Sequence, residues 1–252
     1  MNYHYTKKDV DNILKNGLKV MSTFCCGGGS SFGYKLAGYD VIAANDIDPQ
    51  MKAVYLANHN PKHFFLCPIK DLLTMDLPDE LYNLDILDGS PPCSLFSRAS
   101  TKRENFWGKE KAFREGQAVQ VLDELFFDFI ALADKLKPKI VIAENVEGII
   151  ESNARKYVIR INKELQKIGY KVDCYSRNSK KMGIPQSRQR VFFVAYRVEL
   201  NFPKPNLEFD FPQITLGEVE RLGYPKTGRV ATETMAKWWR RTKVGEIGRA
   251  HV

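Results

Sequence analysis

A cysteine of this chain stands directly after two prolines. The segment reads Gly89-Ser90-Pro91-Pro92-Cys93, and the apolar residues before it predict a short core strand. Cys93 is therefore expected just past the carboxyl end of a strand, where open α/β sheets bind their ligands. Because prolines fix φ and lack a backbone donor, they orient the thiol without the help of a regular element. Such a thiol can serve as a nucleophile, although an ordinary turn cysteine would have the same local sequence.

An acid and two guanidinium groups are expected near the same edge of the sheet. Glu144 directly follows an apolar run that predicts a strand, so its carboxyl can hydrogen-bond a heterocycle or cap the following helix. After Pro185, an extended backbone turns Gln186, Arg188 and Arg190 to one side. This row fits either a functional site or an edge of structural salt bridges. Together these segments bring a thiol, an acid and a guanidinium to the loops of one sheet.

A glycine-rich turn followed by an acid indicates a site for a nucleoside cofactor. The run Gly27-Gly28-Gly29 follows a predicted strand at 18–24, and Asp46 ends the next predicted strand. Glycines let the backbone approach a ligand closely, and the acid can accept hydrogen bonds from ribose hydroxyls. No Gly-Lys-Ser/Thr follows, which excludes a P-loop, and the spacing is an imperfect NAD fingerprint.

The sequence predicts no catalytic metal. His59 and His63 are four residues apart, but Pro61 lies between them and disrupts the helix that would align their rings. The five cysteines include the adjacent pair Cys25-Cys26 and no CxxC pair, so they lack the spacing of zinc ligands. An odd number of cysteines without such spacing indicates reduced thiols in a cytosol-like compartment.

The elements that carry these residues alternate between strand and helix. Apolar runs predict strands over residues 18–24, 39–44, 64–66, 84–87, 140–143, 172–175 and 191–196. Helical patterns lie at 34–37, 49–58, 118–136 and 154–168. Thr6 with Asp9 predicts a capping box that starts an N-terminal helix ending at Gly17. The alternation predicts an α/β fold with a mostly parallel, doubly wound sheet, and the Pro- and aromatic-rich residues after 200 mark a domain boundary.

The composition indicates a basic globular protein. The 252 residues are 44% hydrophobic and 27% charged, and no apolar run approaches the ~20 residues of a membrane span. The N-terminus does not resemble a signal peptide. The net charge of +8 concentrates in residues 151–190, which hold eleven Lys or Arg against three acids, and residues 98–117 are also basic. These segments fit either solvated helix faces or a surface that binds a polyanion such as nucleic acid.

The order of the motifs over about residues 18–200 resembles that of the cytosine-C5 DNA methyltransferases. The resemblance rests on Phe24 with Gly28-Gly29, Asp46 with Ile47, Pro91-Pro92-Cys93, Leu125-Phe126-Phe127, Glu144-Asn145-Val146 and Gln186 to Arg190. It implies a Rossmann-like methyltransferase fold and S-adenosyl-L-methionine as the cofactor. The implied cofactor contacts are Phe24, Gly28, Gly29, Asp46 (ribose), Ile47 and Ile69 (adenine), Pro92 and Leu125.

The resemblance also implies a mechanism. Cys93 would add as a thiolate to C6 of cytosine, which makes C5 nucleophilic toward the methyl group. Glu144 would grip the N3 and amine edge of the base, and Arg190 would sit on O2 with Arg188 nearby. A base inside a duplex cannot be reached in this way, so the target must flip out. Implied substrate contacts are Ser97, Asn145 and Gln186.

The chain departs from the family pattern at three positions and in its C-terminal part. Cys26 replaces a usual glycine and Ser94 a common Gln. Pro68 stands where the family commonly has an Asp that contacts the adenine amine, so weaker cofactor binding is expected. No complete recognition region or final Gly-Asn motif is visible. We therefore expect a truncated methyltransferase, with a catalytic and cofactor-binding domain at 1–205 and the start of a target-recognition region at 206–252.

Three functions fit these features. The first is a DNA cytosine methyltransferase of a restriction-modification or phage-like system, cytoplasmic, with double-stranded DNA as its partner and no membrane association. The second is a tRNA cytosine-C5 methyltransferase, because charge does not separate DNA from RNA. The third is a non-catalytic module that binds nucleic acid or cofactor. The intact Cys93, Glu144 and Arg190 favour an enzyme, and the sequence indicates neither the target sequence nor an oligomeric state.

Overall fold

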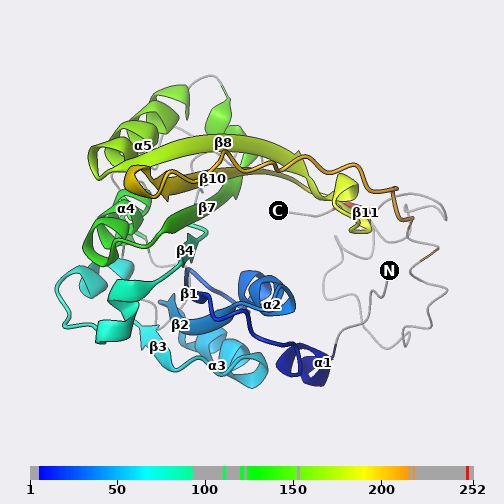
Figure 1. Ribbon diagram of the computed structural model, residues 1–252, viewed down its shortest axis with the longest axis horizontal. Helices are drawn as coiled ribbons and strands as arrows, with labels where there is room; N and C mark the ends of the chain where they lie inside the picture. Colours follow the sequence, from blue (N-terminus) through cyan, green and yellow to red (C-terminus); the bar gives the residue numbers. More distant parts are fainter. Residues whose placement is uncertain are drawn as a thin grey trace. The chain divides into compact units, whose positions relative to one another are not determined.

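The computed structural model describes residues 6–92, 124–151 and 154–215, residue 218, and the backbone of 110–111, 120–121 and 248–249. Cys93 and Ser97 therefore lie outside the described residues, as does the tryptophan pair at 238–239. The chain forms two compact units, and Figure 1 shows the elements of each. The first unit contains residues 1–175 and 191–204, and the second contains 176–190 and 205–252. The predicted division at residue 205 stays a prediction.

Seven strands form the main sheet, in the order β3-β2-β1-β4-β7-β10-β8. The strands are β1 (Lys19–Thr23), β2 (Asp40–Asp46), β3 (His63–Leu66), β4 (Ile86–Gly89), β7 (Ile140–Val146), β8 (Tyr170–Asn178) and β10 (Gln189–Arg197). The five strands from β3 to β7 are parallel. The strand order reverses between β1 and β4, and open α/β sheets bind ligands at the carboxyl ends of such a pair.

The strand β10 runs against its neighbours. At its end, the N–H of Arg197 donates to the carbonyl of Lys139 (3.1 Å), which precedes β7. The N–H of Val198 donates to the carbonyl of Gly169 (3.0 Å), which precedes β8. The end of β10 thus lies beside the starts of both strands, so β10 is antiparallel to them. The predicted Rossmann-like, mostly parallel sheet is confirmed, with this one strand reversed.

Helices cover both faces of the sheet. In Figure 1, α1 (Lys7–Asp11), α2 (Gly29–Leu36) and α3 (Pro49–Asn58) lie on one side, and α4 (Leu125–Leu136) and α5 (Arg155–Lys167) lie on the other. Successive side chains of each strand pack against the helices of opposite faces, because they point to opposite sides of the sheet. Val20 and Ile86 pack with Tyr34 of α2, whereas Met21 and Leu87 belong to the main core against α4.

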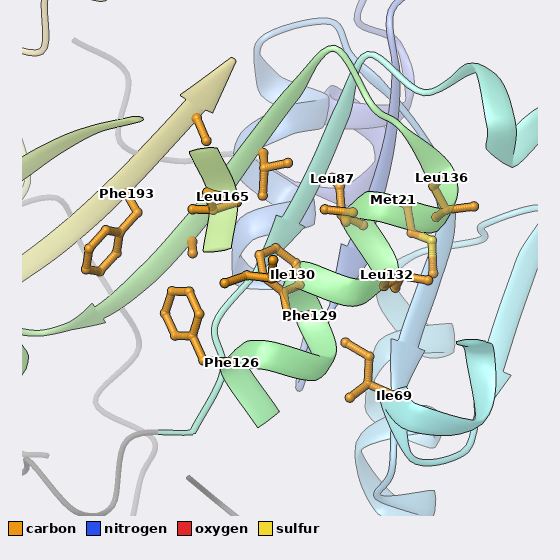
Figure 2. Close-up of a cluster of buried hydrophobic side chains, with 14 of the residues drawn as sticks. Met21, Ile69, Leu87, Phe126, Phe129, Ile130, Leu132, Leu136, Leu165 and Phe193 are labelled. Carbon is orange, nitrogen blue, oxygen red and sulfur yellow. The ribbon is translucent and has the colours of Figure 1, made fainter. Parts of the chain in front are cut away.

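The main core is built largely by α4. Its buried positions follow a helical period and are Leu125, Phe126, Phe129, Ile130, Leu132, Ala133 and Leu136. Figure 2 shows Phe126, Phe129 and Ile130 pointing into a cluster that also holds Met21 and Leu87 from the sheet. The predicted helix at 118–136 is thus confirmed only from Leu125, because residues 120–121 form a strand.

Short elements complete the fold. They are the 3₁₀ turns η1 (Ile69–Leu73), η2 (Asp79–Asn83), η4 (Glu147–Ile150), η6 (Ser179–Lys181) and η7 (Val198–Leu200), and the two-residue strands β5 (Glu110–Lys111), β6 (Gln120–Val121), β9 (Gln186–Ser187) and β11 (Gly248–Arg249). The strand β9 pairs in parallel with β11 inside the second unit. Across the described part of the chain, no helix is both long and apolar enough to cross a membrane.

Candidate active site

The loop between β1 and α2 has an unusual backbone. Phe24 and Cys26 have φ values of +50° and +45°, and Gly28, which caps α2, has φ +88°. Left-handed backbone at non-glycine residues is costly and is often found at functional sites. The loop is held by a hydrogen bond from the N–H of Gly28 to the carbonyl of Cys25 (2.8 Å). Gly27 and Gly29 are exposed, so this turn can present backbone N–H groups to a ligand.

Asp46 fixes the shape of this loop from the end of β2. Its Oδ2 accepts the N–H of Cys26 at 2.7 Å, and its Oδ1 accepts the N–H of Asp48 at 2.9 Å. The carboxylate is buried. Because an ionised carboxylate has about four acceptor sites, these two bonds leave further sites for hydroxyl donors. Asp46 can therefore shape the loop and accept bonds from a ligand at the same time.

Asp46→Asn is expected to lower the free energy of unfolding by about 1–3 kcal/mol. The new amide group must face one of the two backbone N–H groups, so either Cys26 or Asp48 loses its acceptor. The same change should weaken binding of the cofactor that the resemblance implies, which can be measured with S-adenosylhomocysteine by calorimetry beside urea unfolding of both proteins. A variant with wild-type stability and affinity would contradict this role.

Gly28 is required by a close contact with His59. A Cβ at Gly28 would lie 2.3 Å from two ring atoms of His59, which is only 3% exposed at the end of α3. The ring also packs on Tyr55, with centroids 4.8 Å apart. Burial lowers the pKa of His59, so the ring is held neutral against the loop. His59 is thus a packing partner of the glycine turn, which the sequence did not indicate.

Gly28→Ala is expected to destabilise the fold by about 2–4 kcal/mol, because it combines a left-handed φ with an overpacked contact. Gly29→Ala is the matched control, since no atom lies within 4 Å of a Cβ there. Denaturant unfolding of the two variants measures the difference. Equal stabilities would show that the loop relaxes away from His59.

A hydrogen bond connects the end of β7 to the segment that leads to Cys93. The Nδ2 of the buried Asn145 donates to the carbonyl of Pro91 at 3.3 Å, and its Oδ1 accepts the N–H of Val146 at 2.8 Å. Glu144, the residue before Asn145, is half-buried on the opposite face of β7. The structure therefore joins two of the predicted motifs, although Cys93 itself lies outside the described residues.

Three of the other predicted cofactor residues, Phe24, Ile47 and Pro92, come shortly after the ends of β1, β2 and β4. Phe24 packs on Phe129, with ring centroids 6.5 Å apart, and Ile47 and Pro92 are half-buried. Ile69 and Leu125 are each 2% exposed and belong to the main core. Contact of these two side chains with a ligand stays a prediction.

A cavity of about 320 Å³ opens beside the glycine turn. It is lined by Lys7, Val10, Asp11, Gly27, Gly28, Gly29, Phe32, Asn58 and His59. Asp46 and Ile47 are not among these residues. The cavity therefore gives access to the turn from the side of α1, away from the predicted ribose and adenine contacts.

The predicted polar row lies in the second unit. Gln186 is in β9 and Arg190 is in β10, while Arg188 lies between the two strands. The N–H of Arg188 donates to Ser179 Oγ at 3.1 Å, and the carbonyl of Arg188 accepts the N–H of Ser179 at 3.0 Å. Arg190 is 8% exposed, and its Nη1 donates to the carbonyl of Gln189 at 2.7 Å. Hydrogen bonds within the second unit hold the backbone of this row in place. A substrate role for the row stays a prediction.

Sequence reasoning missed a buried acid in β4. Asp88 is 5% exposed and accepts hydrogen bonds from Ser22 and Tyr34. The available signal was an acid directly after the predicted strand at 84–87, the same pattern that singled out Glu144 after the strand at 140–143. Burial raises the pKa of Cys25, which makes this thiol a poor nucleophile. No group of three metal-ligating side chains occurs within the described ranges.

Known proteins resemble this chain over most of its length. A model of the C-5 cytosine-specific DNA methylase family matches residues 18–238. The chain belongs to this family. The type II methyltransferase M.NgoPII of Neisseria gonorrhoeae is 33% identical over 208 residues, which are 81% of this chain and 56% of that protein. M.FnuDI of Fusobacterium nucleatum is 31% identical, over 81% of this chain and 53% of that protein.

Solved structures agree with the methylase fold. The S. pombe Dnmt2 methyltransferase has a TM-score of 0.55 at 19% identity, covering 92% of this chain and 69% of that one. A protein encoded within an E. coli prophage has a TM-score of 0.64 at 22% identity, covering 84% of this chain and 56% of that one. At these identities the likeness concerns the fold alone. This family member spans about half the length of the curated relatives that it matches.

Proposed function

We propose that this chain transfers a methyl group from S-adenosylmethionine to C5 of cytosine in double-stranded DNA. Family membership supports the chemistry, and the hydrogen bond from Asn145 to Pro91 carries the assignment to this site. It ties the strand that bears Glu144 to the segment that ends at Cys93. Attack on a cytosine ring requires an acid and a thiol near each other, and β7, which bears Glu144, is paired with β4, the strand that precedes Cys93.

The proposed cofactor site fits the loop after β1. S-adenosylmethionine, when bound, supplies a methyl group activated by a positively charged sulfur. The free acceptor sites of Asp46 suit ribose hydroxyls, and the exposed glycine backbone suits a polar ligand. Phe24, Ile47, Ile69, Pro92 and Leu125 are the proposed apolar contacts.

The proposed chemistry assigns one step to each polar motif. The Cys93 thiolate forms a bond to C6 of the flipped cytosine, while Glu144 donates a proton to N3 as charge develops on the ring. Arg190, with Arg188, stabilises the charge at O2. Once C5 carries the methyl group that the cofactor supplies, loss of the C5 proton to water would expel the thiolate, and return of the N3 proton to Glu144 would restore the neutral ring. Ser97 and Gln186 are proposed contacts to the DNA, together with Asn145.

DNA is the proposed partner because the charge distribution favours a polyanion. Residues 151–190 hold eleven of the chain's 38 basic residues with only three acids. A modification enzyme with these substrates works beside the chromosome, so a cytoplasmic location is proposed as well.

The decisive experiment is transfer of a radiolabelled methyl group to mixed-sequence duplex DNA, with tRNA tested in parallel. Incorporation into DNA at C5 of cytosine is expected. Incorporation into tRNA alone would show that tRNA is the substrate and that the proposed reaction is right. If a folded protein that binds the cofactor labels neither nucleic acid, the proposed function is wrong for this chain.

A further inference from the structure

The strand β4 carries a buried carboxyl group five residues before Cys93. Asp88 is 5% exposed in a strand whose neighbouring side chains, Ile86 and Leu87, are core residues. Burial raises the pKa of Asp88 to about 6, and hydrogen bonds from Ser22, Tyr34 and Ser30 offset part of that effect. Burying a carboxyl group costs free energy unless it is hydrogen-bonded, so the partners of Asp88 are part of what keeps it in the strand.

Asp88 joins three elements around the cofactor loop. Its Oδ2 accepts from Ser22 Oγ and its Oδ1 accepts from Tyr34 Oη, each at 3.1 Å. Its carbonyl accepts from Thr23 Oγ1 at 3.0 Å. Ser22 and Thr23 end β1 just before the glycine loop, and Tyr34 lies on α2 just after it. Asp88 of β4 therefore hydrogen-bonds both to the strand before the glycine loop and to the helix after it.

Asp88 also shares a sheet face with Glu144. Asp88 pairs with Ile142 across β4 and β7, and Glu144 is two residues further along the same face. Repulsion from Glu144 contributes to the raised pKa of Asp88. Tyr34 and Tyr55 lie on the helices of this face and also interact with Asp88, so the carboxylate is linked electrostatically to the loop, the helices and the catalytic acid.

We propose that Asp88 is a positioning residue of the methyl-transfer site. Its carboxylate fastens the glycine loop and α2 to the strand that leads to Cys93, and protonation of Asp88 loosens cofactor binding. A carboxylate accepts from all of its hydroxyl neighbours, whereas the protonated acid must itself donate to one of them. The inference rests on the proposed function, because it assumes that S-adenosylmethionine binds at this loop.

The test is calorimetric binding of S-adenosylhomocysteine from about pH 5 to about pH 8. In the wild-type protein, the Kd should rise about three- to tenfold as the pH falls through a midpoint near 6. Asp88→Asn keeps the shape and removes the charge, so its Kd at high pH should match the wild-type value at low pH. Titration of the ligand itself is common to both proteins and cancels in the comparison.

Tyr34→Phe separates this role from simple packing. It removes a hydrogen bond that lowers the pKa of Asp88, so the midpoint of binding should move to higher pH. If Tyr34 were a purely structural contact, its loss would weaken binding at every pH and leave the midpoint in place, and this outcome would overturn the inference. An unchanged pH dependence of binding in Asp88→Asn would also overturn it. Because binding is measured without methyl transfer, an inactive protein that binds the ligand would refute the proposed function and still test Asp88. Complete absence of binding would overturn both.

Discussion

Replacing Cys93 with serine is expected to lower methyl transfer to duplex DNA by at least about 10³-fold. The two side chains have nearly the same shape, but a serine hydroxyl stays protonated where a thiol can form the nucleophilic anion. Without addition to C6, C5 of cytosine does not become nucleophilic. The measurement is the initial rate of methyl incorporation at equal protein concentrations, with stability checked by denaturant unfolding.

A trapped adduct tests the same residue independently. With S-adenosylmethionine present, DNA that contains 5-fluorocytosine should give a denaturant-resistant complex with the wild-type protein, because after methyl transfer the fluorine cannot leave C5 as a proton does. Cys93→Ser should give no complex. Cys174→Ser is the matched control, since Cys174 is exposed on β8, and it should keep both activities. A complex that persists in Cys93→Ser and is lost in Cys174→Ser would refute the assignment.

Local sequence predicts where the helices α1 and α3 begin. The capping box of Thr6 and Asp9 is present as predicted, although α1 ends at Asp11 rather than near Gly17. The helix α3 has the predicted bounds because Asp48 caps it and accepts the N–H of Gln50 at 2.8 Å. In both cases, the signal lies within a few residues of the helix end.

Two features depend on contacts that no local pattern contains. The strand β10 is reversed because it lies between β8, which ends shortly before it in the sequence, and β7, which is distant in the sequence. The helix α2 begins at Gly29, earlier than predicted, within a Gly-Ser run of low helix propensity. Ser31 is fully buried there and bonds to Tyr55 Oη at 2.8 Å, so tertiary packing overrides the local preference.

The candidate site was predicted where residues belong to a recognised motif, and Asp88 was missed because it belongs to none. Glu144 and Asp46 follow apolar runs, and parallel strands bring such ends together. Asp88 directly precedes the segment from Gly89 to Cys93, and its hydroxyl partners come from β1 and α2. Its role is visible only once the three elements are assembled.

Glu144→Gln is expected to lower kcat for methyl transfer by about 10²–10³-fold while changing the KM for DNA little. Glutamine can still donate to N3 and accept from the exocyclic amine of cytosine, so recognition of the base is retained. An amide cannot transfer a proton, so charge that develops on the ring during attack by Cys93 is no longer neutralised. Steady-state kinetics on duplex DNA separates these two effects.

Two further variants decide whether the loss reflects proton transfer. Glu147→Gln makes the same change in charge three residues later, in η4, and should leave kcat nearly unchanged.

Asn145→Ala removes the bond to Pro91 and should act through the position of the Cys93 segment, lowering both the rate and the yield of the 5-fluorocytosine adduct. Glu144→Gln should instead leave the adduct attainable on long incubation, because the thiol remains in place. If the glutamine variant lost base binding and kept its kcat, Glu144 would be a recognition residue and the proton would have to come from another group.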